Sequence, residues 1–350
     1  MKFGSDNCAG TAPEILEAIA AAARDNAPAY GSDAYSRAAE AAVNATFERT
    51  CATFLVATGT AANALALAAL APPGHLVFCH EEAHIVDDEC AAPEFFGGGT
   101  KLIGIPGIGG KIPPDALRET LARYPRGQVR HAPPSALSLS QATEAGTLYT
   151  LAEIAELAEI AHAAGLSVHM DGARFANAVA ALDVSPAETT WKAGVDVLSL
   201  GATKNGALAC EAVVFFDPAR AADFAVRRKR GGQTLSKGKF LGAQMEAWFQ
   251  DDLWLKLARR ANFQAQRLAR GLERVPGLAW AWPVEANELF PILPDATIAR
   301  LLSAGAVFHA WTSRGHGPNR APRPGETCLR LVTSFETTDA EIDAFVAAAV

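Results

Sequence analysis

Short apolar runs alternate with helical patterns from about residue 50 to residue 235. The runs are continuous rather than alternating, which is typical of strands that are buried on both faces of a parallel sheet. They lie at Cys51–Ala57, His75–Cys79, Lys101–Ile105, Ala136–Ser140, Ser167–Met170, Val195–Leu200 and Ala212–Phe216. The helical patterns between them include Thr60–Ala71, Pro114–Arg123 and Thr150–Ala164. This alternation predicts an α/β fold with a large, mainly parallel sheet covered by helices.

The pattern changes near Gly242, where a long helical pattern, Ala243–Leu272, could connect two domains. Beyond it, the expected elements are strands Asn287–Leu293, Ala306–Trp311 and Thr327–Val332, helices Ala296–Ala304 and Asp339–Ala349, and a loop at Arg314–Gly325. We therefore predict a large domain over residues 1–242 and a small C-terminal α+β domain over residues 243–350, which includes the connecting helix.

Charge and composition narrow the class of protein. A net charge of −7 gives no basic surface for nucleic acid. The alanine-rich run Ala64–Pro73 is too short to span a bilayer, and residues 1–6 show no signal-peptide pattern, so no membrane partner is expected. The six cysteines lack CxxC spacing, which is typical of reduced cysteines in a cytoplasmic protein without a metal site or structural disulfides.

Two of the expected strands lead into reactive side chains. Ser167–Met170 is followed by Asp171 and Arg174, and Val195–Leu200 is followed by Lys204. A buried parallel strand opens into a site at its carboxyl end, so one strand would present a carboxylate and the other an amine. This pair suits pyridoxal 5'-phosphate (PLP), which needs a Schiff-base lysine and a partner for its ring nitrogen.

Two further segments could contact such a cofactor. Thr58–Asn63 opens a helix directly after a strand, so the backbone N–H groups near Gly59 and the hydroxyl of Thr60 could bind a phosphate. By itself the hexapeptide fits a plain strand-to-helix turn equally well. His84 stands at an expected helix start, where it could be a surface capping residue or a ring lying on an aromatic cofactor.

In chain order, these segments resemble the threonine aldolase branch of the fold-type I PLP enzymes, close to the β-eliminating lyases and in particular to the low-specificity L-threonine aldolases. The resemblance covers nearly the whole chain. Each motif by itself is short, but the order in which the motifs follow one another is specific to the family. The matching segments are Gly4–Asp6, Tyr30–Asp33, Thr58–Asn63, Ala83–His84, Leu137–Ser140, His169–Arg174, Thr203–Asn205, Arg227–Gly232 and Leu329–Val332. The resemblance implies a fold-type I architecture with PLP as cofactor.

The resemblance also implies roles for residues at the cofactor. Lys204 would hold PLP, and Asp171 would keep its ring nitrogen protonated, so that the ring becomes an electron sink. His84 would stack on the ring. The residues that would bind the phosphate are Gly59, Thr60, Arg228 and Lys229. Arg228 and Lys229 would reach it across a subunit interface, which implies a homodimer or homotetramer, although adjacent cations are often only a solvated helix end.

The remaining roles concern the amino-acid substrate. The residues that would bind it are Ser5, Tyr30, Arg174 and Arg330. Arg174 would reach the cofactor O3' or the substrate carboxylate, and Arg330 would bind that carboxylate from the small domain through a bidentate pair. Tyr30 also belongs to the segments that reach the cofactor phosphate. Each arginine could instead be an exposed surface charge, so these roles depend on the resemblance.

The sequence departs from the family's pattern at Glu144. Family members often carry a histidine there, close to the β-hydroxyl of the substrate. A carboxylate in a partly dry pocket can have a raised pKa and act as a general base. It could equally exclude or reorient substrates that the histidine accepts, so Glu144, His84 or a water molecule could be the base.

The reaction implied is a retro-aldol cleavage of L-threonine, L-allo-threonine or a related β-hydroxy-α-amino acid to glycine and an aldehyde. A phenylserine-type aldolase and a β-eliminating lyase are alternatives on the same scaffold, as are racemisation and transamination. A non-catalytic PLP-binding protein would not need the substrate-carboxylate residues. A dinucleotide enzyme is excluded, because no GxGxxG follows a strand; Gly97–Gly99 and Gly107–Gly110 do not fit.

Overall fold

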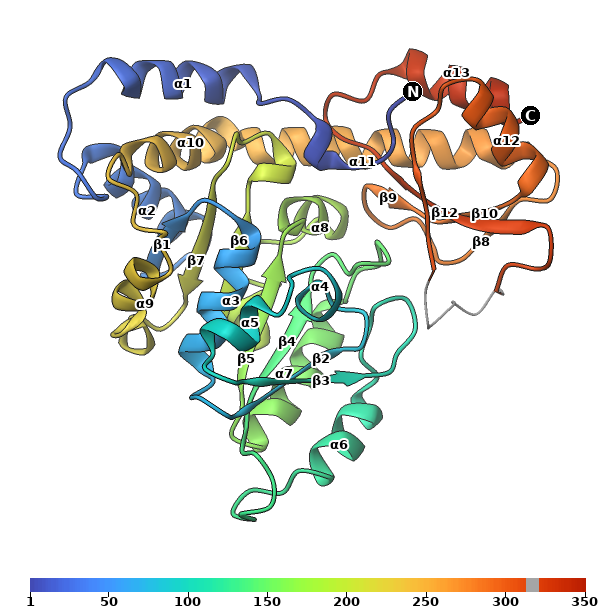
Figure 1. The fold of residues 1–350 in the computed structure, drawn as a ribbon. Coiled ribbons are helices and arrows are strands. Elements are labelled where there is room, and N and C mark those ends of the chain that lie inside the picture. Colours follow the sequence, from blue (N-terminus) through green and yellow to red (C-terminus); the bar gives the residue numbers. More distant parts are fainter. Residues whose placement is uncertain (313–320) are drawn as a thin grey trace.

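The computed structural model describes residues 1–312 and 321–350, and its centre is a seven-stranded sheet (Figure 1). The strands are β1 (Ala52–Val56), β2 (Leu76–His80), β3 (Lys101–Ile105), β4 (Pro134–Ser140), β5 (Ser167–Gly172), β6 (Val197–Gly201) and β7 (Glu211–Phe215). They lie in the order β1-β7-β6-β5-β4-β2-β3. Strands β2 to β6 run parallel, while β7 is antiparallel to both of its neighbours, β1 and β6. The first residue of β7 therefore lies at the same end of the sheet as the carboxyl ends of β4, β5 and β6.

Helices cover both faces of this sheet. They are α1 (Pro13–Arg24), α2 (Ala34–Thr46), α3 (Gly59–Leu70), α4 (His84–Asp87), α5 (Ala92–Phe96), α6 (Pro114–Ala122), α7 (Leu151–Ala163), α8 (Phe175–Leu182), α9 (Phe224–Arg230) and α10 (Lys239–Phe249). Met170 and Leu198 belong to a core that they share with α7 and α8. Val197 and Phe215 point to the opposite face and pack against α3 and α9. Because successive strand residues alternate between faces, the side chains beside Met170 in β5 face α3.

A smaller antiparallel sheet forms the C-terminal α+β part. Its elements are α11 (Leu253–Leu272), β8 (Ala279–Trp280), β9 (Glu288–Leu289), β10 (Pro291–Pro294), α12 (Asp295–Ser303), β11 (His309–Ala310), β12 (Glu326–Val332) and α13 (Asp339–Ala349). Strand β12 pairs with β9, β10 and β11. The N-terminus also packs here, with Phe3 edge-to-face on Phe345 at a centroid distance of 5.0 Å. Both chain ends accordingly lie beside this sheet (Figure 1).

Local sequence accounts for several helix starts. Thr150 and Glu153 form a capping box at α7, and Thr338 and Glu341 form another at α13. At α3 the hydroxyl of Thr58 accepts the Ala61 N–H. Helix α3 is apolar on most of its surface because it is buried against the sheet, with a continuous run of buried residues from 62 to 68.

The sequence predicts the fold class correctly: the structure is α/β with a large, mainly parallel sheet and a small C-terminal α+β part. The long helix expected at Ala243–Leu272 is two helices, α10 and α11, which Figure 1 shows nearly end to end. The break occurs because Asp251 and Asp252 adopt positive φ angles of 51° and 55°. The loop expected at Arg314–Gly325 falls mostly on residues 313–320, which lie outside the described residues. Within residues 1–312 and 321–350, no helix has the length and hydrophobicity needed to cross a membrane.

Candidate active site

A stripe of polar side chains crosses the ends of three neighbouring strands on the α3 face. In the register of the sheet, Ser138 lies beside His169, and Ser140 and Ser199 flank Asp171. The hydroxyls of Ser138 and Ser199 each lie 2.9 Å from a ring nitrogen of His169. Burial lowers the pKa of His169 to about 4. His169 is therefore a neutral, hydrogen-bonded core residue, and Asp171 is the charged group of the stripe.

A cavity of about 530 Å³ opens on this stripe, within the range of about 300–1,000 Å³ that is common for small-molecule sites. The residues of its wall that the sequence also singled out are Gly59, Thr60, His84, Glu144, Asp171, Arg174 and Lys204. The cavity thus joins these residues from five segments of the chain. Within the described residues, the others that the sequence singled out, Ser5, Tyr30, Arg228, Lys229 and Arg330, do not line it.

Lys204 lies in a 3-10 turn, Thr203–Asn205, which follows β6. Burial, followed by the positive charge of Arg174, lowers the pKa of the Lys204 amine. A larger unprotonated fraction makes this amine a better nucleophile toward an aldehyde. The turn depends on a close approach at Gly201, where an added Cβ would stand 2.7 Å from the Ala173 backbone.

Asp171 is the penultimate residue of β5, and both of its carboxylate oxygens accept hydrogen bonds. Its Oδ1 accepts the Ala173 N–H at 3.0 Å, and its Oδ2 accepts the Asn63 side-chain amide at 2.8 Å. The side chain is buried. A buried carboxylate in one fixed orientation is suited to bind a protonated ring nitrogen.

The start of α3 offers donors to an anion. Thr58 Oγ1 accepts the Ala61 N–H at 3.2 Å. The N–H groups of Gly59 and Thr60 come earlier in the helix, where no carbonyl of the same helix can reach them. A Cβ added at Gly59 would meet no atom within 4 Å, so this turn borders open space in the cavity. Such a helix start is a suitable phosphate site.

The residues of the cavity therefore fit PLP. One cavity offers an amine with a lowered pKa at Lys204, a buried carboxylate at Asp171 and an open helix start at Gly59. These groups match, in turn, the aldehyde, the ring nitrogen and the phosphate of the cofactor.

His84 and two glutamates form another part of the wall. The ring Nδ1 of His84 lies 2.8 Å from Glu89 Oε1, and its backbone N–H donates to Glu144 Oε1 at 2.9 Å. Ser140 donates to the same Glu144 oxygen at 2.7 Å. The second oxygens of Glu89 and Glu144 are buried and, among the described residues, have no hydrogen-bond partner. Burial raises the pKa of Glu144 to about 7, and the hydrogen bond to Glu89 raises the pKa of His84.

Four charged residues form what we call the arginine cluster: Asp6, Arg174, Glu288 and Arg330. Arg174 binds Asp6 in a bidentate pair of 2.7 and 2.9 Å, and its third nitrogen lies 3.1 Å from Glu288 Oε2. Arg330 donates twice to Glu288 Oε1, at 3.0 and 2.9 Å. Burial alone would raise the pKa of Asp6, but the charges of Arg174 and Lys204 outweigh it and lower this pKa. Glu288 thus bridges the arginine beside the cavity to the arginine of the small sheet.

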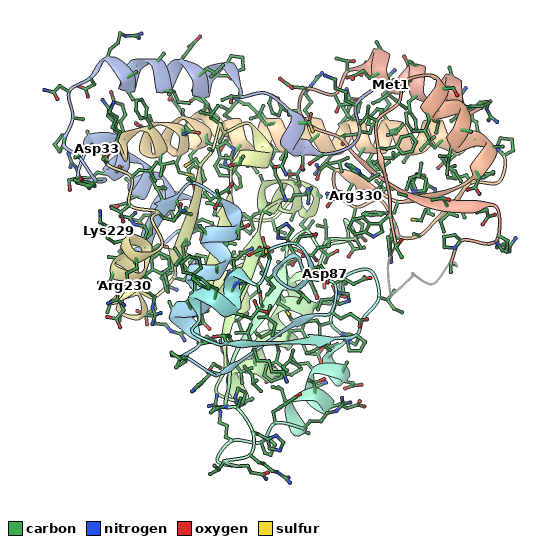
Figure 2. All side chains as sticks on the ribbon, viewed as in Figure 1. Met1, Asp33, Asp87, Lys229, Arg230 and Arg330 are labelled. Atoms are coloured by element: carbon green, nitrogen blue, oxygen red, sulfur yellow. The ribbon has the colours of Figure 1, made fainter. Side chains whose placement is uncertain are left out.

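Several residues expected at the cofactor or substrate lie outside the 530 Å³ cavity. Tyr30 and Arg228 line a second cavity of about 120 Å³, and Lys229 lies 4.9 Å from the Tyr30 ring centroid. Figure 2 shows Lys229 and Arg330 on opposite sides of the view. Ser5 caps a short 3-10 turn, where its hydroxyl accepts the Asn7 N–H at 3.1 Å.

Several residues of the site were not assigned roles from the sequence. They are Asp6, Asn63, Glu89, Glu211 and Glu288. Glu211 had a usable signal, since it is an acidic residue directly before an apolar run. It lines the cavity, accepts the Ala202 N–H at 2.9 Å and has a pKa raised by burial to about 7. Glu89 directly follows two other acidic residues, Asp87 and Asp88. Such a run of acids is typical of a solvent-exposed surface, so nothing in the sequence indicates that Glu89 is buried.

Comparisons with known proteins agree with this geometry. The sequence profile of the family described as "Beta-eliminating lyase" matches residues 2–294. A low specificity L-threonine aldolase of Pseudomonas aeruginosa is 43% identical over 314 residues, which cover 90% of each chain. Another, from Pseudomonas sp., is 38% identical over 341 residues, which cover 97% of this chain and 94% of the relative. A solved structure of Leishmania major threonine aldolase superposes with a TM-score of 0.91 at 28% identity, covering 99% of this chain and 98% of that one.

Proposed function

The chain belongs to the β-eliminating lyase family, and from this premise we propose that it is a PLP-dependent carbon–carbon lyase of the threonine aldolase type. It cleaves L-threonine and L-allo-threonine, or related β-hydroxy-α-amino acids, to glycine and an aldehyde. The names of the similar aldolases support this substrate class. The observation that carries the proposal is the single cavity lined by Lys204, Asp171 and the open start of α3.

Lys204, Asp171, His84, Gly59 and Thr60 hold the cofactor in this proposal. The lowered pKa of Lys204 supports its bond to the aldehyde, and the fixed carboxylate of Asp171 supports its place at the ring nitrogen. When bound, PLP supplies an electron sink for the electron pair left at Cα as the Cα–Cβ bond breaks. His84, which lines the same cavity, would lie against the cofactor ring.

The substrate carboxylate is bound at the arginine cluster, with Ser5 of the same chain and the partner subunit's Tyr30 as further contacts. Arg174 lies beside the cavity and Arg330 reaches Glu288 from the small sheet, which supports binding between these two parts of the chain. Fixing the carboxylate aligns the Cα–Cβ bond for cleavage, and orientation of this kind can contribute about 7–11 kcal/mol.

Glu144 takes the proton from the β-hydroxyl oxygen in this proposal. Two donors hold its Oε1, while Oε2 has no hydrogen-bond partner among the described residues and is left to face the substrate. A pKa of about 7 suits a base that works near neutral pH. His84 positions Glu144 through its backbone N–H. After the aldehyde leaves, Cα receives a proton and glycine is formed.

The finer parts of the proposal concern location and assembly. The unpaired state of all six cysteines supports a cytoplasmic protein. Tyr30, Arg228 and Lys229 contact the cofactor phosphate of a neighbouring subunit, so the protein is a homodimer or homotetramer. The position of these residues outside the 530 Å³ cavity of their own chain supports this assembly. Residues 1–242 and 243–350 form the two domains.

The test is to mix the PLP-loaded protein with L-threonine and, separately, with L-allo-threonine, and to assay acetaldehyde and glycine together. Equal amounts of both products are expected. Benzaldehyde from phenylserine alone would indicate the aryl-specific alternative, and pyruvate with ammonia from L-serine would indicate β-elimination, which the family's description favours as second candidate. Absence of acetaldehyde from both threonines would overturn the proposal.

A further inference from the structure

Hydrogen bonds connect Asp171 to Glu144 through three intermediate residues. The Asn63 amide nitrogen lies 2.8 Å from Asp171 Oδ2 and 2.8 Å from Glu89 Oε1, so its two hydrogens go to two different carboxylates. Glu89 Oε1 also binds the His84 ring at 2.8 Å, and the His84 N–H binds Glu144. Glu89 lies in the middle of this chain of contacts.

The burial of Glu89 needs a physical reason. Its side chain is 0% exposed, and a buried carboxylate is costly unless it is paired. Within residues 1–312 and 321–350, its ion-pair partner is the imidazole of His84 rather than a lysine or arginine. A residue whose role was only to fill the core would be apolar at this position.

Helix α4 depends on an outside anchor. It consists of the four residues His84–Asp87, and no side chain caps its start. A single helical turn has little stability by itself, because nucleation is costly. The bond between the His84 ring and Glu89, together with the bond from Glu89 to Asn63 in α3, ties this turn to the sheet-covering helix. The backbone N–H that holds Glu144 starts the same turn.

We propose that Glu89 is a positioning residue of the reaction proposed above: it fixes the His84 ring on the cofactor side and, through the His84 backbone, fixes Glu144 at the substrate hydroxyl. Asn63 extends this positioning to Asp171. Glu89 lines the cavity, but in this proposal it takes no part in the bond changes itself. The inference rests on the proposed function only for the identity of the reacting groups, while the chain of contacts exists in the protein as it is.

The test compares Glu89→Gln with Asp87→Asn in the PLP-loaded enzyme. Glutamine keeps the shape and can still accept from Asn63 and His84, but it removes the charge that strengthens these hydrogen bonds. Asp87→Asn removes the same charge from α4 itself, and Asp87 is not part of the cavity wall as far as the structure describes it. We expect kcat to fall about 100-fold for Glu89→Gln, the loss that a small misplacement of a catalytic group causes, while KM changes little and Asp87→Asn behaves as wild type.

Two readouts separate positioning from a structural role. In ¹⁵N-histidine NMR, assigned with a His84→Gln variant, the His84 ring should titrate at lower pH in Glu89→Gln, because the carboxylate no longer stabilises its protonated form. The acid limb of kcat/KM should move to higher pH, since a looser His84 N–H stabilises ionised Glu144 less. If His84 were itself the base, that limb would move to lower pH with the His84 titration, and the assignment of Glu144 in this proposal would be overturned.

A second variant keeps the test informative if Glu89→Gln folds poorly. Asn63→Leu removes both amide donors at similar volume and should weaken PLP binding, measured by cofactor absorbance during dialysis, at least tenfold. Wild-type kcat, pH profile and His84 titration in Glu89→Gln would overturn the inference. If the wild-type enzyme fails to cleave either threonine, the proposed function fails, but the histidine titration and PLP affinity still decide the positioning chain.

Discussion

Two groups of buried polar residues at the cavity differ in how their charges are paired. In the arginine cluster each carboxylate oxygen lies within 3.1 Å of an arginine nitrogen. Arg174 donates to both oxygens of Asp6, and Arg330 donates to Glu288 Oε1. Glu288 Oε2 has an ion pair with Arg174 but, among the described residues, no hydrogen bond. On what we call the acceptor side, formed by Asn63, His84, Glu89 and Glu144, three buried oxygens have no hydrogen-bond partner among the described residues. They belong to Asn63, Glu89 and Glu144.

The difference separates stability from reactivity. A buried charge that is fully paired holds its neighbours in place, and removing one partner leaves the other uncompensated. A buried acceptor without a partner costs free energy in the folded state. For Glu144, burial also raises the pKa to about 7, so this carboxylate can take a proton near neutral pH. Substitutions in the arginine cluster should therefore reduce stability, whereas substitutions on the acceptor side should reduce rate.

The largest effect is expected for Arg174→Leu. This change leaves Asp6 buried without its arginine and leaves Glu288 with Arg330 alone, so the free energy of unfolding should fall by about 3–5 kcal/mol. The measurement is urea unfolding followed by circular dichroism. The matched control is Arg118→Leu, because Arg118 also binds two carboxylates, Asp115 and Glu156, but on the exposed surface. Equal losses in both variants would contradict the division between the two parts.

Glu144→Gln should have its main effect on the rate. Loss of a general base slows cleavage by about 10²–10⁴-fold. Wild-type activity should rise with pH through about 7, as Glu144 loses its proton, and the variant should lack this rise. A pKa above the unfolded value means that ionised Glu144 destabilises the fold above pH 7, so the variant should be at least as stable as wild type at pH 8. An unchanged rate would remove Glu144 from the mechanism.

Glu288→Gln tests whether a carboxylate of the arginine cluster affects substrate binding as well as stability. An amide still accepts from Arg330 but no longer competes by charge with the substrate carboxylate. We expect KM for L-threonine to fall about 2- to 10-fold, a gain in binding of about 0.4–1.4 kcal/mol. Steady-state kinetics and unfolding should be measured together, since stability should fall as well. A higher KM would mean that Glu288 aids substrate binding rather than opposing it.

The smallest effect is expected for Ser140→Ala. The Ser140 hydroxyl is one of two donors to Glu144 Oε1, and it lowers the pKa of that carboxyl. Its loss should move the acid limb of the pH profile to higher pH. The rate at pH 7 should fall by less than about tenfold and recover at pH 9. A loss that persists at high pH would show that Ser140 acts on the reaction by another route.

Most of the sheet could be predicted from the sequence, because its strands are continuously apolar. The strand expected at Lys101–Ile105 has those same bounds, and the other expected strands of this sheet differ by up to two residues at an end. The break at Asp251 and Asp252 could not be predicted, since a helix pattern does not reveal a positive φ. The end of the sheet where Lys204 and Asp171 meet also followed from the rule for parallel strands.

The rest of the site depends on three-dimensional context. Glu211 lies at the site because β7 is antiparallel, so its first residue meets the carboxyl end of β6. The rule for parallel strands applies to charged residues that follow an apolar strand. It does not identify a charged residue that precedes one. Glu89 and Glu288 are buried by elements distant in sequence, through Asn63 and Arg330. No local pattern distinguishes them from surface acids.

The most direct test of the central claim is to find which lysine carries the cofactor. The PLP-loaded protein is reduced with borohydride, digested, and its labelled peptide is identified by mass spectrometry. The account predicts a single pyridoxyl label on Lys204, and no label with loss of turnover in Lys204→Ala. A label on another lysine, such as Lys229, or full turnover in Lys204→Ala, would contradict the assignment of this cavity as the active site.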